Sequence, residues 1–280
     1  MTTAVAAPFR FFSLRVVRAK RLGPSLVRVT FAGPDLHAFR SDGRDQSLSL
    51  FLPHPGQPEP VVPLELGDGW WQGWRELPAG VRAVMRSYTL RELRRNPDEI
   101  DIDFALHGVG PDAAAPAGPA SRWAARATAG DRVLLLGPAV ADNRAIRFRP
   151  PGDTDLVVLW GDETAVPAAT AILGSLPAGT RVRAWLEVPH AGDVQTVPTR
   201  ADAEVTWLVR HGGPPGADAV RGARLPACER PYVWLAGECG RVKALRRHFV
   251  GERGIDRRRV TFVGHWRQGM TEEQLRATGE

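Results

Sequence analysis

The stretch Arg86-Ser87-Tyr88-Thr89-Leu90-Arg91 decides how the first half of this 280-residue chain is interpreted. It closes a run, residues 84–90, that is rich in strand-favouring types. In an extended strand alternate side chains share a face. Arg86, Tyr88 and Leu90 are therefore predicted on one face, and the residues that alternate with them on the other.

This stretch combines two kinds of side chain that one type of ligand needs. Arginine makes planar, bidentate contacts with phosphate, and tyrosine offers a flat ring for stacking. A flavin dinucleotide presents both a flat ring system and a pyrophosphate. The alternative interpretation, which these six residues leave open, is an arginine-flanked strand at the edge of a sheet.

The rest of the first half is predicted to be β-structure. Apolar residues alternate with polar ones most clearly over residues 100–107, and residues 81–90 are predicted as the central strand. Short strands separated by Gly-Pro turns indicate an antiparallel barrel; the others are predicted at residues 14–17, 27–31, 47–52 and 132–136. A glycine-bearing loop, residues 108–120, leads to a short helix that Ser121 or Ala120 opens, and such a helix start can bind an anion.

The pattern changes after Pro150-Pro151-Gly152, the predicted linker. Residues 155–160 form an unbroken apolar run, as expected of a strand buried on both faces. Strands and helices then alternate, which predicts a parallel α/β sheet. The remaining strands are predicted at residues 181–188, 205–209, 232–236 and 260–263, and the helices at residues 166–176 and from about Cys239 onward. We therefore predict two domains, residues 1–150 and 151–280.

Ligands of such sheets bind at the carboxyl ends of the strands. Two strand ends are candidates: Gly161-Asp162-Glu163-Thr164 and Ala236-Gly237-Glu238. The alternative is that each is only a turn followed by a helix cap, with Thr164 as the cap of the first helix.

Composition narrows the class of protein. Hydrophobic residues make up 43% and charged residues 24%, as in soluble globular proteins. The net charge is +6, but arginines are spread along the chain without a basic cluster, which argues against nucleic-acid binding. Two cysteines show neither disulfide nor metal spacing and favour a reducing, cytoplasmic setting. We expect no signal peptide and no membrane span.

Several motifs, taken in order, resemble the siderophore-interacting protein family, the NAD(P)H-dependent ferric-siderophore reductases among the ferredoxin-reductase-like flavoenzymes. The resemblance covers about residues 12–269. It implies an N-terminal antiparallel β-barrel that binds FAD and a Rossmann-like parallel α/β domain that binds NAD(P)H. Besides residues 86–91, the motifs are residues 103–108 (DFALHG), 118–123 (GPASRW), 161–168 (GDETAVPA), 234–238 (WLAGE) and 264–269 (GHWRQG).

The resemblance also implies roles for single residues. Arg86 holds a flavin phosphate, Tyr88 lies against the isoalloxazine, Thr89 approaches its reactive nitrogen edge, and Arg91 helps with the pyrophosphate or the adenosine half. The complete FAD set is Arg86, Ser87, Tyr88, Thr89, Arg91, His107, Gly108, Gly118, Ala120, Ser121 and Trp123. The NAD(P)H set is Gly161, Asp162, Glu163, Thr164, Arg210, Ala236, Gly237 and Glu238. Arg241 and Arg267 are weak candidates for substrate binding, and a solvated surface charge is the favoured alternative for each. His107 has an alternative role in packing alone.

By this resemblance, electrons pass from NAD(P)H through FAD to the iron of a ferric siderophore, and Fe(II) is released. The chemistry belongs to the flavin, so no catalytic side chain and no protein metal site is expected, and the protein is expected to be a monomer. Two alternatives stay open: a general NAD(P)H–flavin reductase with another acceptor, and a siderophore-binding carrier without redox activity.

Two points of specificity remain open in the sequence. Glu187, near one strand end, indicates NADH, whereas Arg210, near the next, indicates NADPH; the resemblance favours NADPH. The family commonly has a lysine where Ser49 stands and a tyrosine where His265 stands. These departures leave the identity of the siderophore open.

Overall fold

The computed structural model describes residues 7–109, 116–210 and 216–277 of the chain. The chain divides into two compact units. The first consists of residues before 146, except for two short segments, 22–26 and 43–45, which belong with the second. Asp45 explains one exception, because its carboxylate accepts hydrogen bonds from the backbone N–H groups of Arg147 and Phe148 and from the indole of Trp234. The domain boundary at residue 150 stays a prediction.

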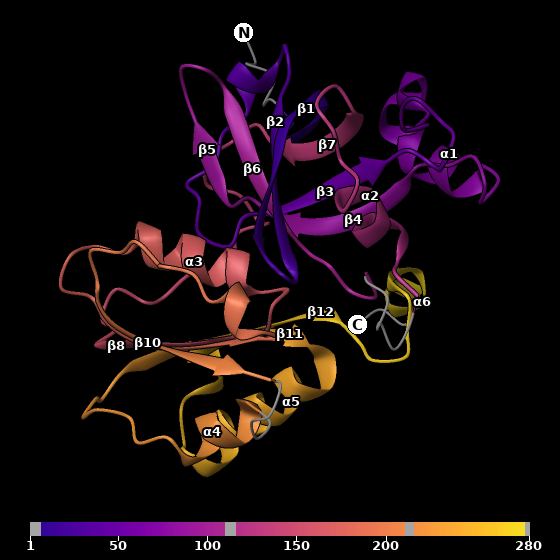
Figure 1. Cartoon of the computed structure of the whole chain (residues 1–280). Helices are drawn as coiled ribbons and strands as arrows, with labels where there is room; N and C mark the ends of the chain where they lie inside the picture. The colour runs from indigo at the N-terminus through magenta and orange to yellow at the C-terminus, as the bar shows by residue number, and fades with distance from the viewer. Residues whose placement is uncertain (1–6, 110–115, 211–215, 278–280) are drawn as a thin grey trace, which may run out of the picture. The chain divides into compact units, whose positions relative to one another are not determined.

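The first unit is a half-barrel formed by a seven-stranded sheet in the order β4-β3-β7-β1-β2-β6-β5 (Figure 1). Its pairs β1–β7, β3–β4, β3–β7 and β5–β6 are antiparallel, which confirms the predicted fold class. The strands are β1 (Phe9–Gly23), β2 (Leu26–Ala32), β3 (Ser47–Leu52), β4 (Val84–Thr89), β5 (Glu92–Arg94), β6 (Glu99–Ala105) and β7 (Arg132–Pro138), and the α-helices are α1 (Trp70–Glu76) and α2 (Pro119–Ala124).

The position of β4 differs from the prediction of a central strand. It begins at Val84 rather than Val81, and it lies at the end of the strand order, next to β3. The reason lies just beyond it: the backbone N–H of Arg91 donates to the carbonyl of Asp101 on β6, 2.9 Å away. After β4 the chain therefore separates from its partner strand β3 and continues into the β5–β6 hairpin.

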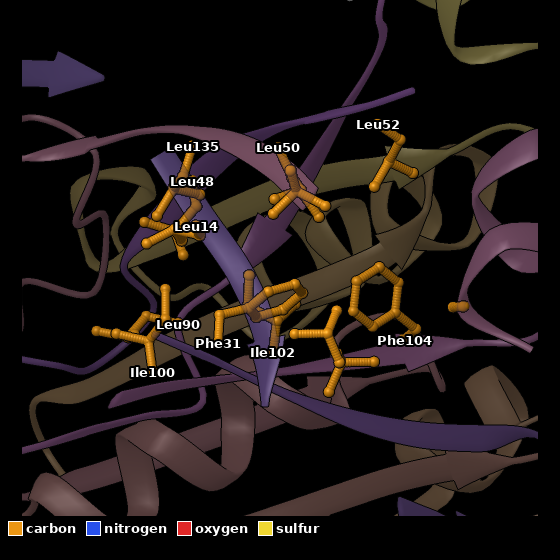
Figure 2. Close-up of a cluster of buried hydrophobic side chains, with 14 of the residues drawn as sticks. Leu14, Phe31, Leu48, Leu50, Leu52, Leu90, Ile100, Ile102, Phe104 and Leu135 are labelled. Atoms are coloured by element: carbon orange, nitrogen blue, oxygen red, sulfur yellow. The ribbon is translucent and has the colours of Figure 1, made fainter. Parts of the chain in front are cut away.

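The core of this unit explains the period of two in β6. Ile100, Ile102 and Phe104 project into one apolar cluster, where side chains from β1, β2, β3 and β7 meet them (Figure 2). Those partners include Leu14, Phe31, Leu48, Leu50 and Leu135.

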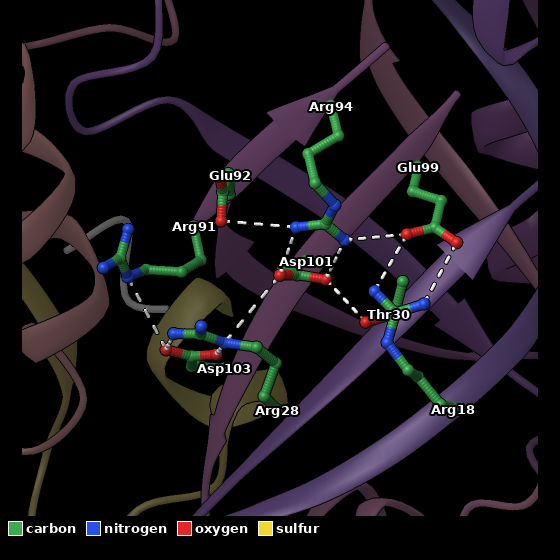
Figure 3. A network of polar contacts seen from close by, with 9 residues as sticks. All are labelled: Arg18, Arg28, Thr30, Arg91, Glu92, Arg94, Glu99, Asp101 and Asp103. Atoms are coloured by element: carbon green, nitrogen blue, oxygen red, sulfur yellow. Dashed lines mark hydrogen bonds and ion pairs between the residues drawn. The ribbon is translucent and has the colours of Figure 1, made fainter. Parts of the chain in front are cut away.

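The polar residues of β6 are buried as well. Asp101 is only 3% exposed and accepts hydrogen bonds from both terminal nitrogens of Arg94, at 2.7 and 2.8 Å, and from the hydroxyl of Thr30 at 2.6 Å (Figure 3). Asp103 takes a bidentate pair of hydrogen bonds from Arg28, at 2.7 and 2.8 Å. An ionic network therefore covers the second face of β6.

Glu99 extends this network to β1. It accepts two hydrogen bonds from Arg18, at 3.1 and 2.9 Å, and a third from Arg94 at 3.0 Å. The hydrogen bonds from Arg18 lower the pKa of Glu99. Because the arginines come from β1, β2 and β5, the alternation within β6 gave no sign of them.

The second unit is a five-stranded parallel sheet in the order β10-β9-β8-β11-β12. Helix α3 covers one face, and α4 and α5 the other (Figure 1). Its strands are β8 (Leu156–Gly161), β9 (Arg181–Val188), β10 (Asp202–Val209), β11 (Pro231–Glu238) and β12 (Val260–Trp266), and its α-helices are α3 (Val166–Ser175), α4 (Gly216–Gly222), α5 (Cys239–Arg247) and α6 (Glu272–Ala277). Every residue of β8 is buried, as its apolar run predicts. No helix within the described residues is long and apolar enough to cross a membrane.

We expect Asp101→Asn to lower the free energy of unfolding by about 3–5 kcal/mol at pH 7, because it removes one partner of a buried ion pair. Asp98→Asn is the matched control. Asp98 pairs with Arg95 at 2.8 Å, but its side chain is 32% exposed, so its loss is expected to cost less than about 1 kcal/mol. Urea denaturation measures both variants. Equal effects would contradict a stabilising role for the network.

The difference between wild type and Asp101→Asn is also expected to depend on pH. Burial by itself raises the pKa of Asp101, but the hydrogen bonds from Arg94 and Thr30 outweigh it, so the pKa is lowered. The stabilisation is therefore complete above the pKa of the unfolded chain, about 3.9, and is lost as the pH falls through the lower folded-state value. Denaturation at pH 7 and at pH 3 should show the difference shrinking.

Candidate functional site

The predicted alternation of side chains holds in β4. Tyr88 and Leu90 face the apolar cluster, and the Tyr88 ring packs on Phe104 with centroids 4.3 Å apart. Arg86, on the same face, is partly buried, and its guanidinium donates to the carbonyl of Met85 at 2.8 Å. Ser87 is exposed. An aromatic ring held rigidly beside a cation is suited to a ligand that is both flat and anionic.

Helix α2 packs beside β4 and β6. It starts at Pro119 with Gly118 as the N-cap residue, earlier than the predicted start at Ser121 or Ala120, because proline is well suited to the first helical position. The hydroxyl of Ser121 does not cap the helix. It accepts the backbone N–H of His107 at 3.2 Å and lies 3.4 Å from the carbonyl of Ala105. Ser121 therefore ties the helix start to the end of β6.

A cavity of about 320 Å³ lies next to these elements. Its wall combines the loop that follows β3, the start of β4 at Val84, and helix α2. Flat and cationic side chains line it, among them His54, Trp123, Arg122, Arg126 and Arg132. Trp123 is itself stacked on Phe31, with ring centroids 6.2 Å apart and planes 7° from parallel. The cavity thus presents the same two kinds of side chain, flat rings and cations, as Tyr88 and Arg86 do on β4.

Of the other residues predicted for FAD, Arg91 belongs to the ionic network of Figure 3, where its Nε is 3.9 Å from Asp103. Burial lowers the pKa of Arg91. Thr89 is buried, His107 is exposed, and Gly108 has a positive φ of 68°, which favours glycine. The part of each in cofactor binding stays a prediction.

In the second unit a single carboxylate joins three strand ends. Asp162, fully buried after β8, accepts the N–H and the hydroxyl of Thr164 on Oδ1, at 3.0 and 2.6 Å. Its Oδ2 accepts the N–H of Glu238 and the indole N–H of Trp266, both at 2.8 Å. The two strand ends singled out in the sequence therefore meet, and β12 joins them.

Gly237 is required by this arrangement. Its φ is +139°, and a Cβ built there would lie 2.5 Å from the carboxylate of Asp162. Only a residue without a side chain allows β11 to pass so close to that carboxylate.

The alternative interpretation of these strand ends as helix caps is half right. Thr164 does not cap α3, whose N-cap residue is Ala165, because its hydroxyl donates to Asp162 instead. Glu238 does cap α5, accepting the N–H of Arg241 at 2.8 Å.

His265 lies beside this group. Its Nδ1 is 3.3 Å from the hydroxyl oxygen of Thr164. Because that hydroxyl donates its only proton to Asp162, the histidine is the donor, and its proton is on Nδ1. Burial lowers the pKa of His265, so its ring is neutral at pH 7.

Glu187 and Arg210, which gave opposite indications of the coenzyme, form one ionic cluster with two further residues. The Nε of Arg210 donates to Glu187 at 2.8 Å, and its Nη2 donates to Glu163. The guanidinium of Arg241 donates to the same oxygen of Glu187 at 2.5 Å. Arg267, the other candidate for substrate binding, is exposed. Within the described residues, no group of three His, Cys, Asp or Glu is placed to hold a metal ion.

The fold and these two groups define a class. An antiparallel half-barrel followed by a parallel five-stranded α/β sheet is the fold of ferredoxin-reductase-like flavoenzymes. Two family models match the chain: the siderophore-interacting FAD-binding domain over residues 15–142 and the siderophore-interacting protein domain over residues 154–269.

Individual relatives agree with the family models. The chain is 31% identical to the ferric vibriobactin reductase ViuB of Vibrio cholerae, over 93% of this chain and 90% of that protein. It is 28% identical to the NADPH-dependent ferric-chelate reductase of Escherichia coli, over 92% and 93% of the two chains. The crystal structure of a siderophore utilization protein from T. fusca is 32% identical over 95% of each chain, with a TM-score of 0.76. The protein belongs to the siderophore-interacting protein family, which confirms the resemblance seen in the motifs.

Gly237→Ala is expected to lower the free energy of unfolding by about 1–3 kcal/mol, because the new methyl group enters the space of the Asp162 carboxylate at a strained φ. Gly152→Ala is the control, since a Cβ there meets nothing within 4 Å, and we expect a change below about 1 kcal/mol. Chemical denaturation of the two variants compares them. An unchanged free energy of unfolding in Gly237→Ala would show that β11 can shift at this point at little cost.

Proposed function

We propose that this protein is a ferric-siderophore reductase that uses FAD and NAD(P)H. The observation that carries the proposal is the full-length likeness to the ferric vibriobactin reductase, which spans both candidate sites. FAD, when bound, supplies the redox chemistry: it accepts a hydride from the nicotinamide and passes electrons singly to iron(III). The protein residues bind and orient the reactants.

The half-barrel fits FAD. The rigid Tyr88 ring offers a surface for the isoalloxazine, and Arg86 a cation for the phosphates. The start of α2, residues 118–121, offers backbone N–H groups toward the pyrophosphate. The cavity bounded by Val84, Trp123 and Arg122 is lined by cationic side chains, which suits the anionic part of the dinucleotide.

The NAD(P)H site of the proposal is the carboxyl edge of the parallel sheet. Strand order places a topological switch point between β8 and β11, the position at which such folds bind nucleotides. The two segments Gly161–Thr164 and Ala236–Glu238 lie at this switch point, and the Asp162 hydrogen bonds fix them. The absence of a side chain at Gly237 lets β11 lie against the Asp162 carboxylate that joins the two segments.

The substrate of the proposal is a ferric siderophore. A net charge of +6 favours encounter with an anionic chelate, and exposed Arg267 is a candidate contact. Reduction weakens the hold of oxygen ligands on iron, because Fe(II) is less highly charged and less hard than Fe(III). We place the protein in the cytoplasm as a monomer. Neither Cys228 nor Cys239 is in a disulfide, which agrees with that location.

Anaerobic absorbance spectroscopy tests the proposal. The protein mixed with FAD should show a perturbed flavin spectrum that bleaches on addition of NADPH or NADH and returns when a ferric siderophore is added. Return with other acceptors but not with ferric siderophores would indicate a general flavin reductase. A protein that binds ferric siderophores but neither FAD nor nicotinamide would be a carrier, and the proposal would be wrong.

We expect Arg86→Ala to weaken FAD binding about 10- to 100-fold, the value of a charge-assisted hydrogen bond to phosphate. Arg15→Ala removes the same charge from an exposed position on β1 and is the control. Quenching of flavin fluorescence gives both dissociation constants. Unchanged affinity in Arg86→Ala would remove Arg86 from the flavin site.

A further inference from the structure

Four charged residues gather at the carboxyl edge of the parallel sheet, and we call them the Arg210 cluster. Glu163 follows β8, Glu187 is the next-to-last residue of β9, Arg210 follows β10, and Arg241 is in the first turn of α5. The strand order β10-β9-β8 makes their three strands neighbours. The cluster therefore lies on the edge where the proposed function places the dinucleotide.

The two acids and the two bases of this cluster differ in accessibility. Glu163 and Glu187 are each 1% exposed, whereas the side chains of Arg210 and Arg241 are each one-third exposed. The carboxylates lie beneath, and the guanidinium groups reach solvent. A ligand arriving from solvent meets the arginines first.

The arginines keep unused donors. A guanidinium has five N–H groups. Arg210 gives its Nε and Nη2 to the two glutamates, and Arg241 gives its Nη1 to Glu187. Within the described chain, Nη1 of Arg210 and both Nε and Nη2 of Arg241 have no hydrogen-bond partner. These donors are fixed in place because the other nitrogens of each guanidinium group are hydrogen-bonded to the glutamates.

Glu187 itself cannot read a ribose hydroxyl here, although it occupies the position at the end of the second strand where dinucleotide folds often carry an acid for that purpose. One of its oxygens already accepts both arginines. The other, Oε2, is buried and has no hydrogen-bond partner among the described residues; Gly216 lies over it so closely that a Cβ built there would be 2.2 Å away. In the sequence the position of Glu187 indicates NADH, but in the structure its carboxylate accepts hydrogen bonds from Arg210 and Arg241.

We propose that Arg210 and Arg241 bind the 2′-phosphate of NADPH and so select NADPH over NADH. The proposal rests on the proposed function, which brings the adenosine ribose to this edge. Two guanidinium groups held side by side can give paired hydrogen bonds to a phosphate. The ordering of both side chains is already complete before the coenzyme arrives, which favours affinity.

The test uses Arg241→Gln, because Arg210 still pairs with both glutamates in that variant. Loss of the charge of Arg210 would weaken the pairing of two buried carboxylates. Its variant is therefore Arg210→Lys, which keeps the positive charge and removes the bidentate guanidinium group. Arg230→Gln is the matched control. It removes one arginine charge just before β11, at the opposite edge of the sheet.

Titration calorimetry with 2′,5′-ADP and with 5′-AMP provides a readout that needs no redox activity. Wild type should bind 2′,5′-ADP more tightly than 5′-AMP. Arg241→Gln should weaken 2′,5′-ADP binding about 10- to 100-fold and leave 5′-AMP binding unchanged, with Arg210→Lys affected in the same direction. Arg230→Gln should behave as wild type. Equal binding of the two nucleotides by wild type, or equal loss of both in Arg241→Gln, would overturn the proposal.

Steady-state kinetics separates this inference from the proposed function. In the FAD-loaded protein Arg241→Gln should raise KM for NADPH and lower the ratio of kcat/KM for NADPH to kcat/KM for NADH, whereas Arg230→Gln should leave both coenzyme reactions unchanged. Flavin reduction by both coenzymes with equal kcat/KM would refute the selection and leave the reductase proposal standing. Tight binding of 2′,5′-ADP by a protein that oxidises neither coenzyme would refute the reductase proposal and leave the phosphate site standing.

Discussion

The buried carboxylate of Asp162 is the constraint on which the second unit depends. It replaces the water that a carboxylate normally keeps with four hydrogen bonds from residues on three segments. Those bonds hold the end of β8, the close passage of β11 at Gly237, and the indole of Trp266 in one arrangement. The nucleotide site proposed at this edge needs strand ends that are fixed in place, and the hydrogen bonds of Asp162 fix them.

The first unit reaches rigidity in a different way. Strand β6 has an apolar face in the core and an ionic face covered by arginines from three other strands. Both faces are fixed, so Phe104, which supports the ring of Tyr88, has little freedom to move. The flat surface proposed for the isoalloxazine is therefore rigid before any cofactor binds, and binding needs less ordering.

Buried acids have a common role in both units. Asp101, Asp103, Glu163 and Glu187 are each almost fully buried and paired with arginines that are more exposed. In the half-barrel the pairs join strands. In the parallel sheet the same kind of pair orients guanidinium groups toward solvent at the edge where a coenzyme is expected. A chain with 37 basic residues, of which only Lys20 and Lys243 are lysines, thus has many forked donors for such pairs.

The sequence by itself determined the class of each unit. The apolar run of β8, the alternation of β6 and the spacing of turns are local patterns, and burial on one or two faces depends on them directly. The motif around Tyr88 and the two strand ends also lie within short stretches, so the sequence could single them out as candidate sites. The tertiary structure alone decided which charges meet. Glu187 and Arg210 are 23 residues apart, and Arg241 lies a further 31 along the chain, 54 from Glu187. Whether an acid faces a ribose or holds an arginine depends on which side chains the fold places beside it, and no local pattern carries that information.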